Sequence, residues 1–331
     1  MKINRVAVLG DGGWGTTLAI LLSNKGFQVR LWSVSAKYAK FLDKKRRNVK
    51  FLPSVSIPKG IQITSDLNSA IDGVQVVLVV IPSQYLRSTL CKIDPKLLRG
   101  KYIVSATKGI ENKSLMRMSE VMRDVLGNFK ISVLSGPTIA NEVAAGLPAA
   151  AVIASPDKEI ARILQGVFIT DRFRVYTNSD TIGAEIGGSI KNVIAIACGI
   201  CDGLGFGTNT KAGLLARGLA EMSRLGVAMG AKASTFPGVS GLGDLVTTCV
   251  SQHSRNRGLG EKIGKGKKLK DILSRMSMVT EGVPTAKSVY ALSRKYRVDM
   301  PITKEVYAVL YNNKSPLKAL DDLMHRRRKE E

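Results

Sequence analysis

The first half of the chain alternates between short apolar runs and segments with helical spacing. The apolar runs predict strands at 3–9, 27–32, 61–64, 74–80, 101–106, 131–134, 149–154 and 173–176. Helical patterns lie between several of them, at 16–25, 83–91, 114–127, 137–146 and 157–168. Continuous β-branched runs such as 76–81 are typical of parallel strands that are covered on both faces. The pattern therefore predicts a doubly wound α/β sheet that extends to about residue 180.

The pattern changes after residue 180, where helical periodicity and glycine loops replace the strand signal. Residues 193–200 are nearly all apolar, which indicates a helix that is buried all round. Further helices are expected at 209–229, 242–250, 258–264, 268–274, 284–296, 303–311 and 316–325. We expect an α/β domain at 1–180 and an all-α domain at 181–331, whose basic tail from Arg326 to Glu331 is disordered.

Composition supports two domains and an anionic small-molecule partner. The 331 residues exceed one ordinary domain. Lys and Arg outnumber Asp and Glu by 50 to 26, a net charge of +24. The basic clusters lack interleaved aromatic residues, so they indicate a solvated surface rather than a specific nucleic-acid site. No membrane span, secretory signal or disulfide framework is predicted, and we expect a cytoplasmic protein.

A glycine-rich turn follows the first predicted strand and opens the first predicted helix. Residues 10–15 read Gly-Asp-Gly-Gly-Trp-Gly and match G-x-G-x-x-G. In this pattern Gly10 allows the tight turn, Gly12 lets backbone N–H groups approach a pyrophosphate, and Gly15 lets the helix contact the strand closely. A structural turn is the alternative, but the strand–turn–helix context favours a Rossmann-type dinucleotide site.

The second predicted strand ends without the acidic residue that usually holds the ribose 2′-hydroxyl of NAD. Segment 27–42 contains Arg30, Ser33, Ser35 and Lys37 and has no carboxylate. This composition permits a 2′-phosphate and favours NADP(H).

Candidate substrate residues follow two later strands. Lys108 comes just after the strand at 101–106, and Ser135-Gly136-Pro137-Thr138 follows the strand at 131–134. Ligands of open α/β sheets bind beyond the carboxyl ends of strands, and the backbone N–H groups of 135–138 can receive an oxyanion. An exposed loop lysine is the alternative interpretation of Lys108.

Lys191 stands at the head of the most apolar predicted helix. Removing an ammonium from water costs several kcal/mol unless the group is paired or used. Desolvation also lowers a lysine pKa, which suits general acid–base chemistry. We expect this ammonium to lie out of water, in a cleft between the sheet and the helical half. The alternative is a helix-end lysine whose stem is buried and whose charge reaches water.

Two further segments carry polar chemistry. Asp244 precedes a helical stretch, so it is either an N-cap or a group that orients a lysine or a substrate hydroxyl. Residues 254–257 read Ser-Arg-Asn-Arg. A guanidinium beside a hydroxyl and an amide suits a phosphate, and a surface arginine is the alternative.

Cysteine and histidine give no metal site in this sequence. Cys198 and Cys201 form C-x-x-C, but they lie within the apolar helix, and Cys91 and Cys249 supply no second pair. Small core residues are the better interpretation. The two histidines, at 253 and 325, lack a partner pattern for a triad or a metal.

These motifs together resemble the bacterial-type NAD(P)-dependent glycerol-3-phosphate dehydrogenases. The segments that carry the resemblance are GDGGWGTTLA, SATKGIE, SGPTIANEVAAGLP, GGSIKNVIAIACGICDGLGFG, RGLAEMSRLG, SGLGDLVTTC, SRNR, VTEGVPT and MPIT. The resemblance implies reversible NAD(P)H-dependent reduction of dihydroxyacetone phosphate to sn-glycerol 3-phosphate, which supplies phospholipid synthesis. It also implies a homodimer.

The resemblance also implies roles for individual residues. Lys191 matches the proton donor and acceptor. Substrate contacts match Lys108, Gly136, Thr138, Asn192, Asp244, Ser254, Arg255 and Asn256. Cofactor contacts match Gly10, Gly12, Gly13, Trp14, Gly15, Val34, Lys108, Ala140, Arg255, Val279 and Glu281.

Two positions depart from the family pattern. Val34 stands where the family often has a basic or histidine residue near the adenosine ribose, which weakens the preference for NADPH. Gly13 stands where many relatives have serine.

Two rival functions remain at this point. A dehydrogenase with the same domain plan could act on a different hydroxy acid and would need a carboxylate anchor. A nucleic-acid-binding protein could use the +24 charge, but it would leave the glycine loop and the buried lysine without a purpose.

Overall fold

The computed structural model describes residues 3–276, 279–328 and 330. The chain forms two compact units, unit 1 (Met1–Lys108 and Met116–Glu185) and unit 2 (Gly109–Leu115 and Ile186–Glu331). The sequence placed the boundary after residue 180. The structure places the boundary after Glu185. The Glu185 carboxylate accepts a hydrogen bond from the Ser119 backbone N–H at 2.7 Å and forms an ion pair with Arg117.

Unit 1 contains the predicted sheet, and its fold class is confirmed. Its strands are β1 (Arg5–Leu9), β2 (Gln28–Trp32), β5 (Gln62–Thr64), β6 (Val76–Val79), β7 (Tyr102–Ser105), β8 (Ile131–Ser135), β9 (Ala149–Ala154) and β10 (Phe173–Asn178). The strand order is β10-β9-β8-β7-β6-β1-β2-β5. The order therefore reverses at β1, and the loop after β1 lies at the switch point where open α/β sheets bind ligands.

One strand pairing differs from the all-parallel expectation. Strand β9 runs antiparallel to β8, with Val133 opposite Ala154 and Ser135 opposite Val152. The connection between the two strands contains only the short helix α6 (Ala140–Ala144). A parallel return usually carries a longer helix across one face of the sheet. The chain therefore reverses direction, and β10 then pairs parallel to β9.

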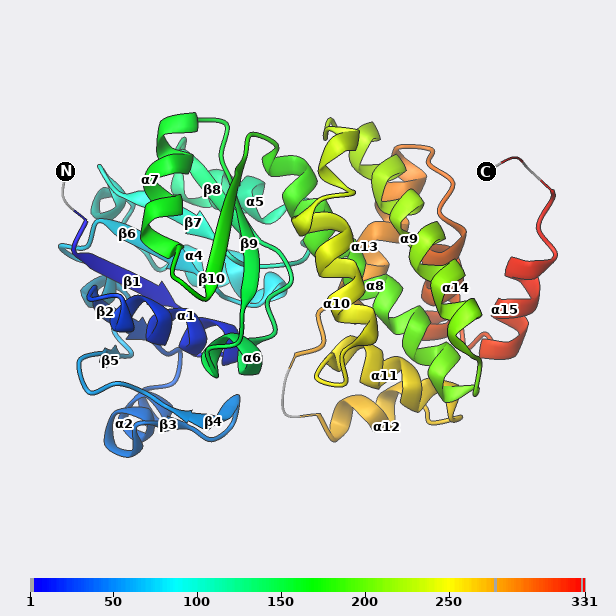
Figure 1. Ribbon diagram of the computed structural model, residues 1–331, viewed down its shortest axis with the longest axis horizontal. Helices are drawn as coiled ribbons and strands as arrows, with labels where there is room; N and C mark the ends of the chain where they lie inside the picture. Colours follow the sequence, from blue (N-terminus) through cyan, green and yellow to red (C-terminus); the bar gives the residue numbers. More distant parts are fainter. Residues whose placement is uncertain (1–2, 277–278, 329, 331) are drawn as a thin grey trace. The chain divides into compact units, whose positions relative to one another are not determined.

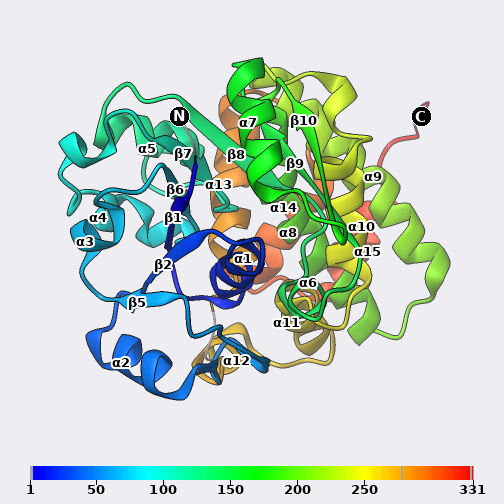
Figure 2. The ribbon, with the colours of Figure 1, turned by 60° about the vertical axis from the view of Figure 1, so that its left-hand side comes forward.

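Helices cover both faces of the sheet. Helices α1 (Gly13–Asn24) and α7 (Lys158–Phe168) contact one face, and α3 (Leu67–Ile71), α4 (Leu86–Leu90) and α5 (Met118–Leu126) contact the other. Figure 2 shows these two sets on opposite sides of the strands. Alternate residues of β1 feed the two cores, as expected for a strand that is buried on both faces.

A helix and a hairpin that were not predicted follow β2. Helix α2 (Ala36–Lys45) is followed by β3 (Arg47–Asn48), which pairs antiparallel with β4 (Leu52–Ser56). Figure 1 shows them in blue, below β5. Because β3 is only two residues long, it has no periodicity that a sequence pattern could reveal.

Helices make up the described part of unit 2. They are α8 (Thr181–Gly203, whose first residues belong to unit 1), α9 (Thr208–Ala228), α10 (Asp244–Val250), α11 (Arg255–Gly264), α12 (Leu269–Ser274), α13 (Gly282–Lys295), α14 (Pro301–Tyr311) and α15 (Pro316–Met324). Figure 1 draws them from green to red. In the tail that was predicted to be disordered, 326–328 and 330 carry no helix, and Lys329 and Glu331 lie outside the described residues.

Helix α8 is the core of the helical unit. Residues 193–200 are all buried, as the sequence predicted. Among the described residues, α8 is the one helix that is long and apolar enough to cross a bilayer by length and composition, and its apolar window is wholly buried inside the protein. The apolar character of α8 is therefore accounted for by its place in the core.

Glycines bring the backbones of α8 and α11 into direct contact. A Cβ atom on Gly199 would lie 2.0 Å from the carbonyl oxygen of Arg257, and one on Gly260 would lie 2.1 Å from that of Ile196. One turn further along, Gly203 and Gly264 meet in the same way. We call these four residues the glycine crossing. No larger residue fits there unless the helices separate.

Candidate functional site

The glycine loop adopts a conformation that requires its glycines. Gly10 has φ +128°, and a Cβ there would lie 2.5 Å from the carbonyl oxygen of Val80. A Cβ on Gly15 would lie 1.9 Å from the carbonyl oxygen of Gly10. Gly12 is the N-cap of α1, which has no side-chain cap, and nothing lies within 4 Å of its Cβ position. No side chain therefore caps the first N–H groups of α1.

Gly13 and Trp14 differ in what surrounds them. A Cβ on Gly13 would lie 2.8 Å from the carbonyl oxygen of Phe51 in the β3–β4 hairpin, so the serine of many relatives would require the hairpin to shift. Trp14 contacts Phe173, with ring centroids 6.3 Å apart. The indole Nε1 of Trp14 is buried without a hydrogen-bond partner among the described residues.

Lys108 joins the ends of two neighbouring strands. It follows β7, and its Nζ donates to the carbonyl oxygen of Gly136 at 2.9 Å and to Thr138 Oγ1 at 3.4 Å, both of which follow β8. Lys108 is therefore not a freely exposed loop lysine. Ala140, the first residue of α6, accepts a hydrogen bond at its carbonyl oxygen from Thr17 of α1 at 3.1 Å. Unit 1 thus gathers these sequence-predicted residues near the start of α1.

Lys191 is buried in the middle of α8, not at its head. The sequence missed the first turns of this helix, which begins at Thr181. Lys191 is 7% exposed, which excludes the interpretation of a helix-end lysine whose charge reaches water. Its Nζ forms an ion pair with the Asp244 carboxylate and donates to Thr248 Oγ1 at 2.7 Å.

Asp244 does not act as an N-cap. It is the first residue of α10, the N-cap is Gly243, and no side-chain cap is present. A π-helical turn, Val239–Gly243, leads directly into α10. The Asp244 side chain is fully buried and turns toward Lys191. The Thr248 hydroxyl donates to the backbone carbonyl of Asp244 at 2.7 Å, which closes a three-residue network.

Two asparagines connect α8, α11 and α13. The Asn256 Nδ2 donates to Asn192 Oδ1 at 2.8 Å, and the Gly282 backbone N–H donates to Asn256 Oδ1 at 2.9 Å. Both asparagines are buried. Because each amide is held by a partner, the geometry at the beginning of α11 is fixed relative to the middle of α8.

The beginning of α11 presents a guanidinium at the surface. Ser254 is its N-cap and accepts a hydrogen bond from the Arg257 backbone N–H at 3.2 Å. Arg255 is exposed, and its Nη1 donates to the carbonyl oxygen of Val279 at 2.7 Å. Glu281 is partly buried and precedes α13. The second arginine of the motif, Arg257, instead forms an ion pair with Asp202.

Comparison with known proteins accounts for both units. The sequence profile described as NAD-dependent glycerol-3-phosphate dehydrogenase N-terminus matches residues 5–161, and the profile described as its C-terminus matches residues 180–321. The chain belongs to the NAD-dependent glycerol-3-phosphate dehydrogenase family. All the sequence-predicted site residues fall within these two matched ranges.

Individual relatives agree over nearly the whole chain. A protein of Chlorobium phaeobacteroides (strain BS1), named glycerol-3-phosphate dehydrogenase [NAD(P)+], is 48% identical over 99% of this chain and 99% of its own. The crystal structure of glycerol-3-phosphate dehydrogenase from Coxiella burnetii has a TM-score of 0.93 at 38% identity, and the match covers 98% of this chain and 99% of that one. The Plasmodium falciparum glycerol-3-phosphate dehydrogenase structure has a TM-score of 0.87 at 27% identity, and the match covers 99% of this chain and 97% of that one.

The glycine loop of this glycerol-3-phosphate dehydrogenase family member fits a dinucleotide. The start of α1 has no side-chain cap and no acidic residue in its first turn, so its partial positive charge is available to a pyrophosphate. The open space at Gly12 permits close approach of a phosphate to the backbone. These features suit the NAD(P) group for which the relatives are named.

Sequence reasoning missed two residues beside the site. Thr248 lies four residues after Asp244, so the spacing of one helical turn could have found it. Asp11 occupies a variable position of the glycine motif, and its carboxylate accepts a hydrogen bond from the Ser33 hydroxyl at 2.6 Å. No local sequence pattern could reveal that contact, because Asp11 follows β1 and Ser33 follows β2.

The cysteines and histidines were not assigned a functional role from the sequence. Cys198 and Cys201 are buried in α8, as expected of core residues. Both histidines are exposed. No group of three or more potential metal ligands occurs among the described residues.

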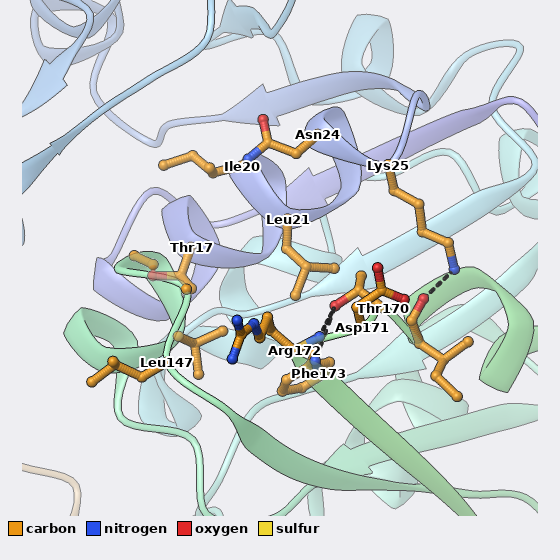
Figure 3. Close-up of a pocket in the computed structure, with 14 residues that line it drawn as sticks. Thr17, Ile20, Leu21, Asn24, Lys25, Leu147, Thr170, Asp171, Arg172 and Phe173 are labelled. Atoms are coloured by element: carbon orange, nitrogen blue, oxygen red, sulfur yellow. Dashed lines mark hydrogen bonds between the residues drawn. The ribbon is translucent and has the colours of Figure 1, made fainter.

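A cavity of about 450 Å³ lies elsewhere on unit 1. Figure 3 shows it between the second half of α1, Leu147 and the segment before β10, with the Arg172 side chain between Leu21 and Leu147. Lys25 at its edge donates to the carbonyl oxygen of Ile169. The residues that line this cavity are not the sequence-predicted site residues, so the cavity is not the predicted site.

Proposed function

We propose that this chain catalyses the reversible NAD(P)H-dependent reduction of dihydroxyacetone phosphate to sn-glycerol 3-phosphate. The observation that carries the proposal is the buried Lys191 ammonium, held by Asp244 and Thr248 in a chain that belongs to this family. Burying this ion pair costs desolvation free energy that an apolar pair would not cost. Buried charges with specific partners are therefore characteristic of functional sites.

Unit 1 is proposed to bind the cofactor. The glycine loop and the start of α1 would hold the pyrophosphate through Gly10, Gly12, Gly13, Trp14 and Gly15. When bound, the reduced nicotinamide supplies the hydride that the ketone carbon C2 receives. Further cofactor contacts, carried over from the family resemblance, are Val34, Lys108, Ala140, Arg255, Val279 and Glu281.

Lys191 is proposed to supply the proton. As C2 gains a hydride, negative charge develops on the C2 oxygen, and an ammonium beside it stabilises that charge. Lys191 first donates a hydrogen bond and then a proton to this oxygen, which leaves a neutral amine and a secondary alcohol. Asp244 and Thr248 fix the direction of the Lys191 Nζ, because both bind it in the structure. Lys108 and Asn192 would orient the substrate.

Arg255 is proposed to anchor the substrate phosphate, with Ser254 and Asn256 beside it. A guanidinium can bind a phosphate through two parallel hydrogen bonds. Binding energy at the phosphate, remote from C2, then positions the reacting carbon. Gly136 and Thr138 would add substrate contacts from unit 1. From the family resemblance, we also propose a cytoplasmic homodimer whose product supplies phospholipid synthesis.

A spectrophotometric assay tests this function. Purified protein is mixed with dihydroxyacetone phosphate and NADH or, separately, NADPH, and the loss of reduced-cofactor absorbance is followed. We expect turnover with the phosphorylated ketone and much slower turnover with dihydroxyacetone, which lacks the phosphate. Turnover of a non-phosphorylated keto acid in place of dihydroxyacetone phosphate would favour the rival dehydrogenase. Tight, steeply salt-dependent DNA binding without turnover would favour the nucleic-acid alternative.

A further inference from the structure

A carboxylate from the glycine loop lies at the end of β2. Strands β1 and β2 pair in parallel with Leu9 opposite Trp32, so the residues after them leave the sheet at the same edge. Ser33 follows β2 and is fully buried, and its Oγ donates to Asp11 Oδ2 at 2.6 Å. The sequence showed no acidic residue in segment 27–42, but the fold brings one there from residue 11.

Asp11 is held in place by a buried network. The Asn48 Nδ2 donates to the backbone carbonyl of Asp11 and to Thr16 Oγ1, at 2.7 Å each. Asn48 is fully buried and accepts a hydrogen bond from the Tyr38 hydroxyl at 2.7 Å. The β3–β4 hairpin therefore fixes the loop residue that carries the carboxylate.

The groups that favoured a 2′-phosphate in the sequence have other partners. Arg30 donates to the carbonyl oxygens of Ser69 and Asp72 and to Gln62 Oε1. The Ser35 hydroxyl caps α2 by accepting from the Tyr38 backbone N–H. The hydroxyl of Ser33 is bonded to Asp11.

The remaining surroundings of this edge contain two exposed lysines. Val34, next in the chain, is 70% exposed and carries no charge. Lys37 is exposed in the first turn of α2. Burial raises the pKa of Asp11, and the hydrogen bond from Ser33 and the positive charge of Lys50 act in the opposite direction. Lys50 lies close enough to Asp11 for their charges to interact, so the Asp11 carboxylate offsets positive charge that would otherwise favour a 2′-phosphate.

We propose that Asp11 takes the place of the missing acidic residue at the end of β2, and that this chain therefore binds NADH in preference to NADPH. A carboxylate there accepts a hydrogen bond from a ribose 2′-hydroxyl and repels a 2′-phosphate, which carries negative charge. This inference rests on the dinucleotide site of the proposed function. It reverses the preference that segment 27–42 indicated.

Direct binding tests this without relying on turnover. NADH and NADPH are titrated separately into the substrate-free protein, with the fluorescence of the reduced nicotinamide as the readout. We expect a dissociation constant for NADH about tenfold or more below that for NADPH. In Asp11→Asn, which keeps an acceptor for Ser33 but removes the charge, we expect the ratio of the two constants to move toward NADPH by about tenfold.

Two further variants make the result specific. Ser33→Ala frees the Asp11 carboxylate from its anchor, and we expect a smaller shift in the same direction. Asp171→Asn removes the same charge from another surface of unit 1, and we expect an unchanged ratio. Circular dichroism of each variant checks that it is folded.

Three outcomes would overturn the proposal. Tighter or equal binding of NADPH by the wild type would refute it and leave the proposed activity intact. An unchanged ratio in folded Asp11→Asn would remove Asp11 as its cause. Failure of both cofactors to bind would refute the preference and the proposed function together.

Discussion

Lys191 and Asp244 form an ion pair in which the two side chains are 9% and 1% exposed. The pair joins the middle of α8 to the first residue of α10. Two charges are costly to remove from water, and a replacement by apolar residues of similar size is often as stable. The presence of this pair in an apolar helix therefore points to chemistry rather than to stability.

Replacing Lys191 should strongly slow the chemical step and leave cofactor binding unchanged. We expect Lys191→Ala to lower kcat by about 10²- to 10⁴-fold, because the C2 oxygen loses its proton donor. The dissociation constant for the reduced cofactor should stay within about twofold of the wild-type value, since the glycine loop is unchanged. Steady-state kinetics and fluorescence titration measure the two quantities.

Lys211→Ala is the matched control for Lys191→Ala. Lys211 also forms an ion pair with a carboxylate in unit 2, that of Asp202, but it lies outside the proposed site. The Lys211→Ala variant should keep the wild-type kcat. Near-normal turnover in Lys191→Ala would exclude Lys191 from the mechanism. Because Asp244 would be left buried without its partner, the melting temperature of the variant is measured as well.

Replacing Arg255 should weaken binding of the phosphate. A hydrogen bond to a charged group contributes roughly 1.5–3 kcal/mol, so Arg255→Ala should raise the KM for dihydroxyacetone phosphate by about 10- to 100-fold. Arg255→Lys keeps the charge but loses the paired donors, so its KM for dihydroxyacetone phosphate should lie between those of the wild type and Arg255→Ala. The slow reaction with dihydroxyacetone, which has no phosphate, should not change. An unchanged KM for the phosphorylated substrate would contradict the anchor role.

The glycine crossing should be intolerant of a single methyl group. In Gly199→Ala the new Cβ would lie 2.0 Å from the carbonyl oxygen of Arg257, so we expect a loss of about 1–3 kcal/mol or more in unfolding free energy. Gly258→Ala in α11 is the control, because nothing lies within 4 Å of its Cβ position. It should gain roughly 0.5–1 kcal/mol from helix propensity. Urea unfolding measures both, and equal stability of the two variants would argue against backbone contact.

Glu221 should make stability depend on pH. It is buried in α9, and its carboxylate accepts hydrogen bonds from the backbone N–H groups of Ile302 at 2.5 Å and Thr303 at 3.1 Å. Burial raises the pKa of Glu221 from 4.5 to about 7. A raised folded-state pKa means that the stabilisation is fully present below the unfolded pKa and is lost as pH rises through the folded pKa.

Urea unfolding of the wild type and of Glu221→Gln at about pH 5 and about pH 8 tests this. The variant cannot ionise, so the wild type should lose roughly 3 kcal/mol relative to it across that interval. Glu159→Gln, at an exposed position in α7, should show no such difference. A constant difference between wild type and Glu221→Gln at both pH values would show that Glu221 does not titrate there.

The sequence predicted what is local in the chain. Strand β1, the glycine loop and α1 are contiguous, and each has its own signature, so their order was correct. Lys191 was found because the apolar run at 193–200 begins two residues after it. Its place within α8 was wrong because the preceding turns, at 181–190, are rich in glycine and weak in apolar periodicity.

What the sequence did not predict depends on contacts between distant residues. The antiparallel pairing of β9 with β8 was not predicted, because a strand pattern does not contain the direction of the strand. The bonds from Asn192 to Asn256 and from Ser33 to Asp11 join residues 64 and 22 positions apart. Such pairings arise only when helices and strands meet, and hydrophobic periodicity carries no record of them.

The glycine crossing also has a consequence for how this protein can vary between species. Because main-chain atoms set the spacing of α8 and α11, that spacing does not depend on the size of surrounding side chains. Apolar residues on α9 and α14 can therefore change in size without altering the spacing of α8 and α11. The sequence of the rest of the helical unit can therefore diverge, while the four glycines keep the beginning of α11 at the same distance from α8.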